Sequence, residues 1–194
     1  MAQTIGTMKR LKKFLPQNIM KMLYNSLVLP HLTYGIILCG KKLKRLRKLQ
    51  KWALRTIVNA KYNAHSAPIL SKLKLLSVDD IYKITAIKIF HKYKNDKLPP
   101  FFSNIFELNE PMPEHNYELR HRQERISTPH TVGAAQSPKF LIPTIIGQIS
   151  PQITAMFESE SPKSTSNAAK KLFIEAYPIE CTIENCYICN ESQA

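Results

Sequence analysis

The spacing of hydrophobic residues predicts helices through the first hundred positions, and it is clearest over residues 43–62. Turning that stretch by about 100° per residue separates two faces. The apolar face holds Leu43, Leu46, Leu49, Ala53, Leu54 and Ile57. The opposite face holds Lys44, Arg45, Lys48, Lys51 and Arg55, with Arg47 at the border. No Gly or Pro interrupts the stretch, so the pattern predicts a strongly basic amphipathic helix.

The same period predicts helices ahead of this stretch. Apolar residues between positions 5 and 15 keep helical spacing with no capping residue before them, which indicates a fragment whose upstream partner is missing. Pro16 predicts the start of the next helix, since a first-turn proline gives up an N–H that has no partner. Pro30 predicts its end. Residues 31–39, HLTYGIILC, predict a short buried helix closed by Gly40, with a strand as the alternative.

Two further segments complete the predicted bundle. Residues 69–76 indicate one or two helical turns. Ser77 then predicts an N-cap, with Asp80 three residues later in the place of the capping-box carboxylate. The helix from Val78 to about Lys94 has apolar residues nearly all round it, so we expect it to be the most buried one.

After Glu107 prolines recur and no long period survives. Residues 107–165 therefore predict loops, short strands and turns. We expect residues 159–167 to be mobile and residues 168–177 to form a last helix. The expected fold class is mainly α. A helical bundle over about residues 5–106 would be followed by an irregular, Pro-rich appendix, giving two regions, 1–106 and 107–194.

Charge is distributed unevenly along the 194 residues. Residues 1–100 hold 21 Lys and Arg against 3 Asp, whereas residues 101–194 hold 7 Lys and Arg against 11 Glu. No acidic residue precedes Asp79. This asymmetry indicates a nucleic-acid or other anionic partner for the first half of the chain.

Trp52 lies off the apolar stripe of the basic helix, beside Arg45. One interpretation is a solvated lysine-rich face with Trp52 packed under a neighbouring element. The other is a phosphate-facing surface with one aromatic platform, the combination that single-strand binders use. Six cations without an interleaved acid are unusual for a helix that is merely solvated.

The order of the motifs resembles one protein family. Residues 15–36 (LPQNIMKMLYNSLVLPHLTYGI), 48–70 (KLQKWALRTIVNAKYNAHSAPIL) and 73–102 are followed by YELRHR at 117–122 and CTIENCYICN at 181–190. Together these resemble the C-terminal part of non-LTR, LINE-type (jockey-like) retrotransposon reverse transcriptases, over nearly the whole chain. The family usually has Arg where this chain has Trp52.

The resemblance implies a helical thumb that follows the palm of an RNA-directed DNA polymerase and holds the template–primer duplex. It also implies that Lys44, Arg45, Lys48, Lys51 and Arg55 contact the nucleic-acid backbone. Trp52 is added to these candidate binding residues as the aromatic platform of the same helix, which the resemblance does not imply. The implied partners are an RNA or DNA template–primer and the missing upstream palm and fingers domains, where Mg²⁺ is expected.

Catalytic chemistry is not expected from this chain alone. A polymerase needs clustered carboxylates for two metal ions, and the only aspartates are Asp79, Asp80 and Asp96. The Asp79–Asp80 pair superficially resembles the family's Asp-Asp hairpin, but a helical period follows it and capping explains it. The scattered histidines lack a paired nucleophile, which disfavours a hydrolase.

Three cysteines near the C-terminus form a Cys-x4-Cys-x2-Cys spacing, at Cys181, Cys186 and Cys189. Thiolates at this spacing bind Zn²⁺, although a structural site needs a fourth ligand that is not visible here. The alternatives are therefore a zinc site and a free-thiol tail. The cysteines do not form a secreted disulfide framework.

The function expected from these observations is template–primer binding by a polymerase fragment that is inactive alone. The alternative is a helical scaffold whose faces pack against a partner protein. A DNA-binding regulator is a third interpretation, but it would need Asn or Gln among the cations, and Gln50 lies towards the apolar side. No segment is long enough to span a membrane and no signal peptide is present, so we expect an intracellular location in cytoplasm or nucleus.

Overall fold

The computed structural model describes residues 1–39, 43–100, 137–147 and 161–179, and these are mainly helical with no strand among them. The mainly-α class is thereby confirmed, while no described residue forms one of the expected short strands. Two compact units are present, residues 1–84 with 167–194, and residues 85–166. The expected boundary between 106 and 107 lies outside the described residues.

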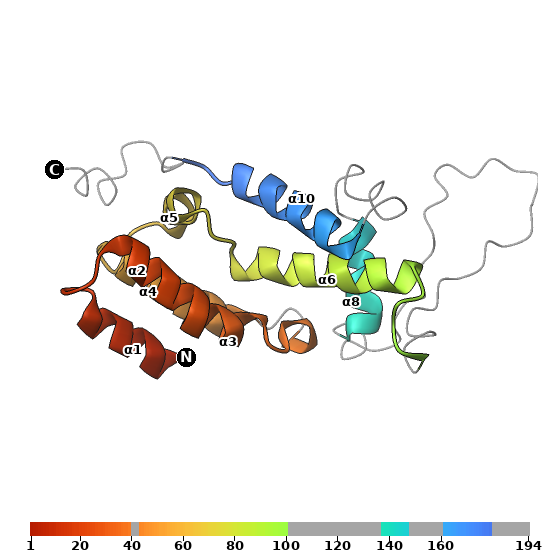
Figure 1. Ribbon diagram of the computed structural model, residues 1–194, viewed down its shortest axis with the longest axis horizontal. Helices are drawn as coiled ribbons and strands as arrows, with labels where there is room; N and C mark the ends of the chain where they lie inside the picture. Colours follow the sequence, from red (N-terminus) through yellow and green to blue (C-terminus); the bar gives the residue numbers. More distant parts are fainter. Residues whose placement is uncertain (40–42, 101–136, 148–160, 180–194) are drawn as a thin grey trace, which may run out of the picture. The chain divides into compact units, whose positions relative to one another are not determined.

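The N-terminal helices of the first unit pack together. Helix α1 (Ala2–Leu11) buries Ile5 and Met8 on one face and contacts α4 (Lys44–Ile57). Helix α2 (Gln17–Leu23) follows Pro16, as predicted, and also contacts α4. Figure 1 shows α1, α2 and α4 side by side. The apolar residues whose spacing predicted these helices thus lie on the side of each helix that packs against its neighbours.

Pro30 does not end the second helix, so that prediction is wrong. After α2 the chain passes through a π-helical turn, η1 (Tyr24–Val28), directly into α3 (Leu29–Thr33). The Leu29 N–H donates to the Tyr24 carbonyl, five residues back. Proline normally clashes with the carbonyl four residues before it. The wider turn just ahead of Pro30 changes that register, which lets the helix continue for another turn.

The segment 31–39 forms neither the predicted buried helix nor the alternative strand. Helix α3 ends at Thr33, Gly35 adopts a positive φ of 63°, and a 3₁₀ turn, η2 (Ile36–Cys39), follows. Leu32 and Ile36 are buried, but the Tyr34 side chain is 91% exposed. The left-handed glycine breaks the helical path, so the apolar run alone did not determine the element.

Helices α5 (Ser66–Leu73) and α6 (Val78–Lys94) follow α4. Helix α5 ends at Lys74 in the left-handed conformation, and it contacts α4. Among the described helices, α6 has the largest share of buried residues, as predicted. Ser77 caps α6, because its hydroxyl accepts a hydrogen bond of 3.1 Å from the Asp80 N–H. The N-cap prediction is confirmed, but the Asp80 carboxylate accepts the Ser77 hydroxyl rather than the Ser77 N–H that a capping box would use.

Two helices in the Pro-rich region correct the expectation of loops and mobile residues. Helix α8 (Pro138–Gly147) contains Pro143 and buries Leu141 and Ile142. Its apolar spacing favours burial, which outweighs the local cost of the proline.

Helix α10 (Pro162–Glu175) begins six residues earlier than predicted. Ser161 accepts a hydrogen bond from the Ser164 N–H, and Pro162 is the first helical residue. Serine at the cap followed by proline is a common helix start, so these two residues are the sequence signal for the earlier beginning of α10. Residues 162–167 are therefore helical rather than mobile.

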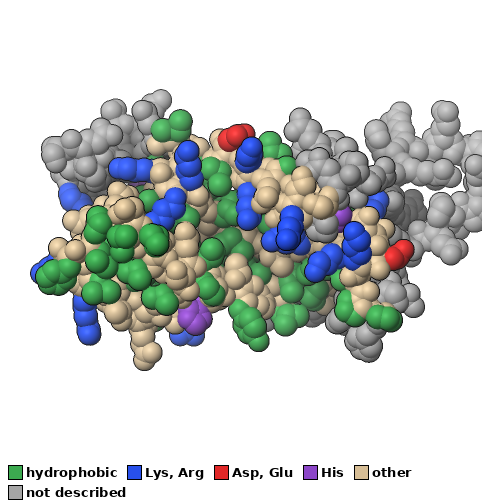
Figure 2. Space-filling model, in the orientation of Figure 1, with side chains coloured by type: hydrophobic (Ala, Val, Ile, Leu, Met, Phe, Trp, Pro, Cys, Tyr) green, Lys and Arg blue, Asp and Glu red, His purple; other side chains and the backbone are tan. Residues whose placement is uncertain are grey.

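The first unit also exposes apolar side chains. Phe14 is 81% exposed in the connection after α1, and Met22 on α2 is 62% exposed. On the face drawn in Figure 2, hydrophobic side chains gather over the N-terminal helices at the left. Exposed apolar side chains that gather in this way are typical of surfaces that contact another molecule.

Candidate nucleic-acid interface

Helix α4 separates its two faces largely as the sequence predicts. Ala53, Leu54 and Ile57 are buried, while Leu46 and Leu49 are only partly buried. The buried face also includes the polar residues Gln50 and Thr56. The helix is thus rotated slightly from the orientation that hydrophobicity alone gives, and the reason lies in the hydrogen bonds of Gln50.

Four predicted binding residues lie exposed on the opposite face of α4, and these are Lys44, Arg45, Lys48 and Lys51. None of the four has an ion-pair partner within the part of the chain that the structure describes. Trp52 lies on the same helix and is 37% exposed. The helix therefore presents uncompensated positive charge beside a partly accessible aromatic ring.

Arg47 at the border of the basic face is paired. Its Nε donates to Asp79 Oδ1 and Oδ2 at 3.0 and 2.8 Å, and its Nη2 donates to Oδ1 at 2.6 Å. Hydrogen bonding to Asp79 raises the pKa of the Arg47 guanidinium. Such a two-pronged contact fixes geometry as well as charge. Arg47 therefore joins α4 to the start of α6 and adds no uncompensated charge to the basic face.

Arg55 differs from the other predicted binding residues. Its Nε donates to the backbone carbonyl of Ala64 at 2.8 Å, and its side chain is only partly exposed. Burial lowers the pKa of the guanidinium from its usual value, although Arg stays charged at neutral pH. Arg55 thus holds the connection after α4 in place. Its environment differs from that of the four exposed cations, because it is partly buried and hydrogen-bonded.

Gln50 is the centre of a hydrogen-bond network that joins three segments. Its Nε2 donates to the Tyr24 hydroxyl at 3.0 Å and to the Leu76 carbonyl at 2.8 Å, and its Oε1 accepts from the Val78 N–H at 2.9 Å. Burial raises the pKa of the Tyr24 hydroxyl, and the hydrogen bond with Gln50 opposes this shift. A buried amide needs such partners, and here they lie on η1 and at the start of α6.

A second network closes the start of α6 with a residue a hundred positions away. The Ser77 N–H donates to the Tyr177 hydroxyl at 2.9 Å, and that hydroxyl donates to Asp80 Oδ2. Ser77 Oγ also donates to Asp80 Oδ2, at 2.6 Å. In an ordinary capping box the carboxylate would accept the Ser77 N–H itself. Tyr177 takes that place here, which ties the end of the α10 segment to α6.

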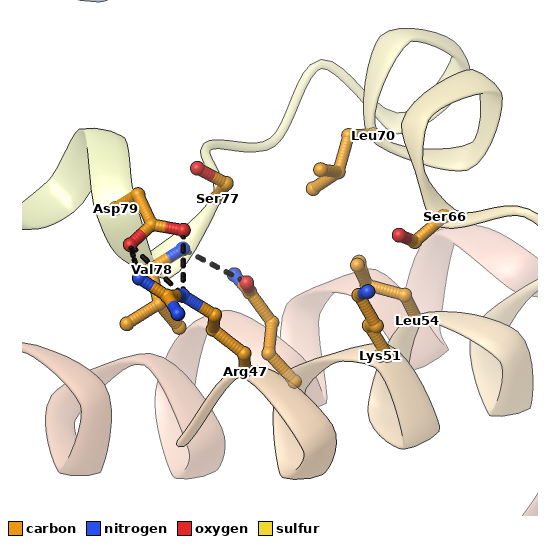
Figure 3. A pocket seen from close by; sticks show the side chains of 9 residues that line it. Arg47, Lys51, Leu54, Ser66, Leu70, Ser77, Val78 and Asp79 are labelled. Atoms are coloured by element: carbon orange, nitrogen blue, oxygen red, sulfur yellow. Dashed lines mark hydrogen bonds and ion pairs between the residues drawn. The ribbon is translucent and has the colours of Figure 1, made fainter. Parts of the chain in front are cut away.

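A pocket lies between α4, α5 and the start of α6 (Figure 3). Its volume is about 110 Å³. The Arg47–Asp79 pair lines one side, while Lys51 and Ser66 face it from α4 and α5. Leu54 and Leu70 supply apolar walls, and together with Gln50, Ser77 and Val78 they complete the lining. No sequence pattern predicted this pocket, because its residues come from three separated segments.

The aspartates have structural partners. Asp79 binds Arg47, and Asp80 binds Ser77 and Tyr177. The described residues hold no group of three or more His, Cys, Asp or Glu side chains arranged to bind a metal. Cys181, Cys186 and Cys189 lie outside those residues, so the zinc hypothesis stays a prediction. No helix in the described ranges combines the length and the apolar composition needed to cross a membrane.

Comparison with known proteins identifies no relative. No family model, no curated protein and no solved structure matches the chain. The resemblance to non-LTR reverse transcriptases therefore stays a prediction from the motifs.

Proposed function

We propose that this chain is the template–primer-binding thumb region of a non-LTR retrotransposon reverse transcriptase and acts inside the cell. The observation that carries the proposal is the exposed face of α4, where Lys44, Arg45, Lys48 and Lys51 lack acidic partners in the described ranges. Trp52, 37% exposed on the same helix, offers a ring for base stacking. The charges bind the backbone without reading sequence.

The polymerase chemistry is assigned to palm and fingers domains supplied by the rest of the enzyme. Asp79 and Asp80 are used in pairing and capping, which leaves no carboxylate cluster for two metal ions in the part of the chain described. We expect no template-directed primer extension from the purified chain with Mg²⁺ or Mn²⁺. Extension by this chain alone would contradict the assignment.

The test of nucleic-acid binding is the salt dependence of affinity for an RNA–DNA hybrid. Four phosphate contacts predict a slope of log K against log salt of roughly −3 to −4. Replacing Lys48 and Lys51 with Gln should flatten the slope by about 1.5 units. The matched control replaces Lys92 and Lys94 of α6, which are also exposed, and should leave the slope nearly unchanged.

A helical scaffold is the second candidate, and the exposed apolar side chains of Phe14 and Met22 favour it. A scaffold would bury these side chains against a partner protein, and its cations would stay solvated. Its salt slope would be shallow and would not respond to Gln at positions 48 and 51. That result would remove support for the nucleic-acid proposal and leave the scaffold standing.

A further inference from the structure

The pocket between α4, α5 and the start of α6 is lined by two polar groups that have no partner in the described ranges. Lys51 forms no ion pair, and the Ser66 hydroxyl has no hydrogen-bond partner, among the residues that the structure describes. Both face the pocket in Figure 3. Every other hydrogen-bonding side chain of the lining is occupied, since Arg47 binds Asp79, Gln50 binds Val78 and Ser77 binds Asp80.

The charge of the lining determines which ligand fits. The guanidinium of Arg47 and the carboxylate of Asp79 neutralise each other, with a shortest contact of 2.6 Å. The ammonium of Lys51 then leaves the lining with a positive charge that no described residue compensates. The walls formed by Leu54 and Leu70 lower the local polarity, which strengthens an ionic contact made there. A small anion with several acceptor oxygens matches these donors.

The size of the pocket agrees with this class of ligand. One water needs about 10–15 Å³ of such space, whereas the pocket offers about 110 Å³. The space therefore admits a group of several heavy atoms but not a nucleoside. Lys51 of α4 is part of the lining, and α4 also carries the exposed Lys48, so a strand lying on that helix can place one phosphate at the pocket.

We propose that this pocket binds one phosphate group of a nucleic-acid backbone, held by the Lys51 ammonium and the Ser66 hydroxyl. The inference rests on the proposed nucleic-acid binding and adds to it a fixed position along the strand. The exposed cations of α4 tolerate many positions of the backbone. A phosphate in the pocket allows a single position of the backbone, so the bound strand has a defined register relative to α4 and α5.

The decisive comparison uses two glutamates of equal charge on the same helix. Ser66→Glu places a carboxylate at the pocket, where it occupies the space and pairs with Lys51. Ser71→Glu adds the same charge elsewhere on α5, outside the lining. We expect Ser66→Glu to remove one phosphate contact and to flatten the salt slope for an RNA–DNA hybrid by about 0.7 to 0.9. Ser71→Glu should not flatten it. Equal slopes in the two variants would overturn the inference.

Inorganic phosphate alone provides the second measurement. Titrated into the free chain, it should shift the amide NMR signals of Lys51 and Ser66 more than that of Ser71, and Ser66→Glu should abolish the difference. Equal shifts at the three amides would overturn the pocket assignment. If the hybrid binds with the expected slope but the two glutamate variants agree, the pocket fails and the proposed function stands. If the hybrid does not bind, the proposed function fails. The pocket then cannot hold a nucleic-acid phosphate, and at most it is a site for free phosphate.

Discussion

The side-chain carbonyl of Gln50 accepts a 2.9 Å hydrogen bond from the backbone N–H of Val78, the first residue of α6. First-turn N–H groups of a helix have no partner within the helix. Residue 50 therefore caps a helix that begins twenty-eight positions later. The same amide donates to the Tyr24 hydroxyl and the Leu76 carbonyl, so one buried side chain fixes α4, η1 and the start of α6. The exposed cations of α4 gain a defined orientation from this contact.

Gln50→Met tests the network while keeping the volume of the side chain nearly constant. The change leaves the Val78 N–H, the Leu76 carbonyl and the Tyr24 hydroxyl without their partner. Each buried polar group left unsatisfied costs about 1–3 kcal/mol, so with three such groups we expect the free energy of unfolding to fall by at least about 3 kcal/mol in total. Urea denaturation followed by circular dichroism measures it.

Tyr24→Phe is the matched control for that measurement. It removes one acceptor of the Gln50 amide and leaves the hydrogen bonds to Leu76 and Val78 intact. The expected loss is about 1 kcal/mol. If Gln50→Met unfolds at the same urea concentration as the unmodified chain, the network does not stabilise the fold.

Tyr177 predicts a loss of stability in alkaline solution. Burial, and next its hydrogen bond with Asp80, raise the pKa of the Tyr177 hydroxyl from 10.0 to about 12. Because the folded-state pKa lies above the unfolded value, the contribution is fully present below pH 10 and is lost as the pH rises through about 12.

Thermal melting at several pH values between 9 and 12 checks this prediction. Lysines titrate in the same range, so the informative quantity is the difference between the unmodified chain and Tyr177→Phe. The melting temperature of Tyr177→Phe should be lower below pH 10, and the gap should narrow as the pH approaches 12. A gap that does not change with pH would show that Tyr177 does not couple to folding in this way.

Local pattern predicted much of the first unit. The start after Pro16, the amphipathic helix α4 and the cap at Ser77 all follow from residues that are close in the sequence. Hydrophobic spacing and capping both depend on residues a few positions apart, so a single sequence is enough to recognise them. The helices α8 and α10 show the limit of local pattern, because a proline predicts a break in a helix, whereas burial in α8 and the first-turn position in α10 allow it.

Contacts between distant residues could not be predicted in the same way. Hydrophobic spacing does not explain why Gln50 lies on the buried side of α4, whereas its hydrogen-bond partners on η1 and α6 do. Tyr177 meets Ser77 across a hundred positions, and the pair Arg47–Asp79 joins two helices. Among the candidate binding residues, the hydrogen bond from Arg55 to the Ala64 carbonyl, nine positions later, distinguishes Arg55 from the exposed lysines, which hydrophobicity alone could not do.

Arg55 and Lys48 should therefore respond differently to the same substitution. Arg55→Gln removes the hydrogen bond to the Ala64 carbonyl and the packing of the guanidinium, so we expect about 1–2 kcal/mol of lost stability and little change in salt slope. Lys48→Gln should leave stability nearly unchanged and flatten the slope by roughly 0.7 to 0.9. Melting curves and salt-titrated binding on both variants compare the two effects. The assignment of Arg55 fails if its variant flattens the slope as much as the lysine variant does.

Substitution of Trp52 distinguishes most clearly between a role in nucleic-acid binding and a role in packing. At 37% exposure the ring is accessible in part, so Trp52→Ala should cost less stability than the ~3–5 kcal/mol of a fully buried tryptophan. If the ring stacks on a base, the affinity for single-stranded RNA falls by ~1–3 kcal/mol while the salt slope stays the same, because stacking releases no counterions. Trp52→Phe keeps a ring for stacking and is the matched control, which should recover most of the affinity. Loss of stability without loss of affinity in Trp52→Ala would assign the ring to packing, and the basic face of α4 would then act through charge alone.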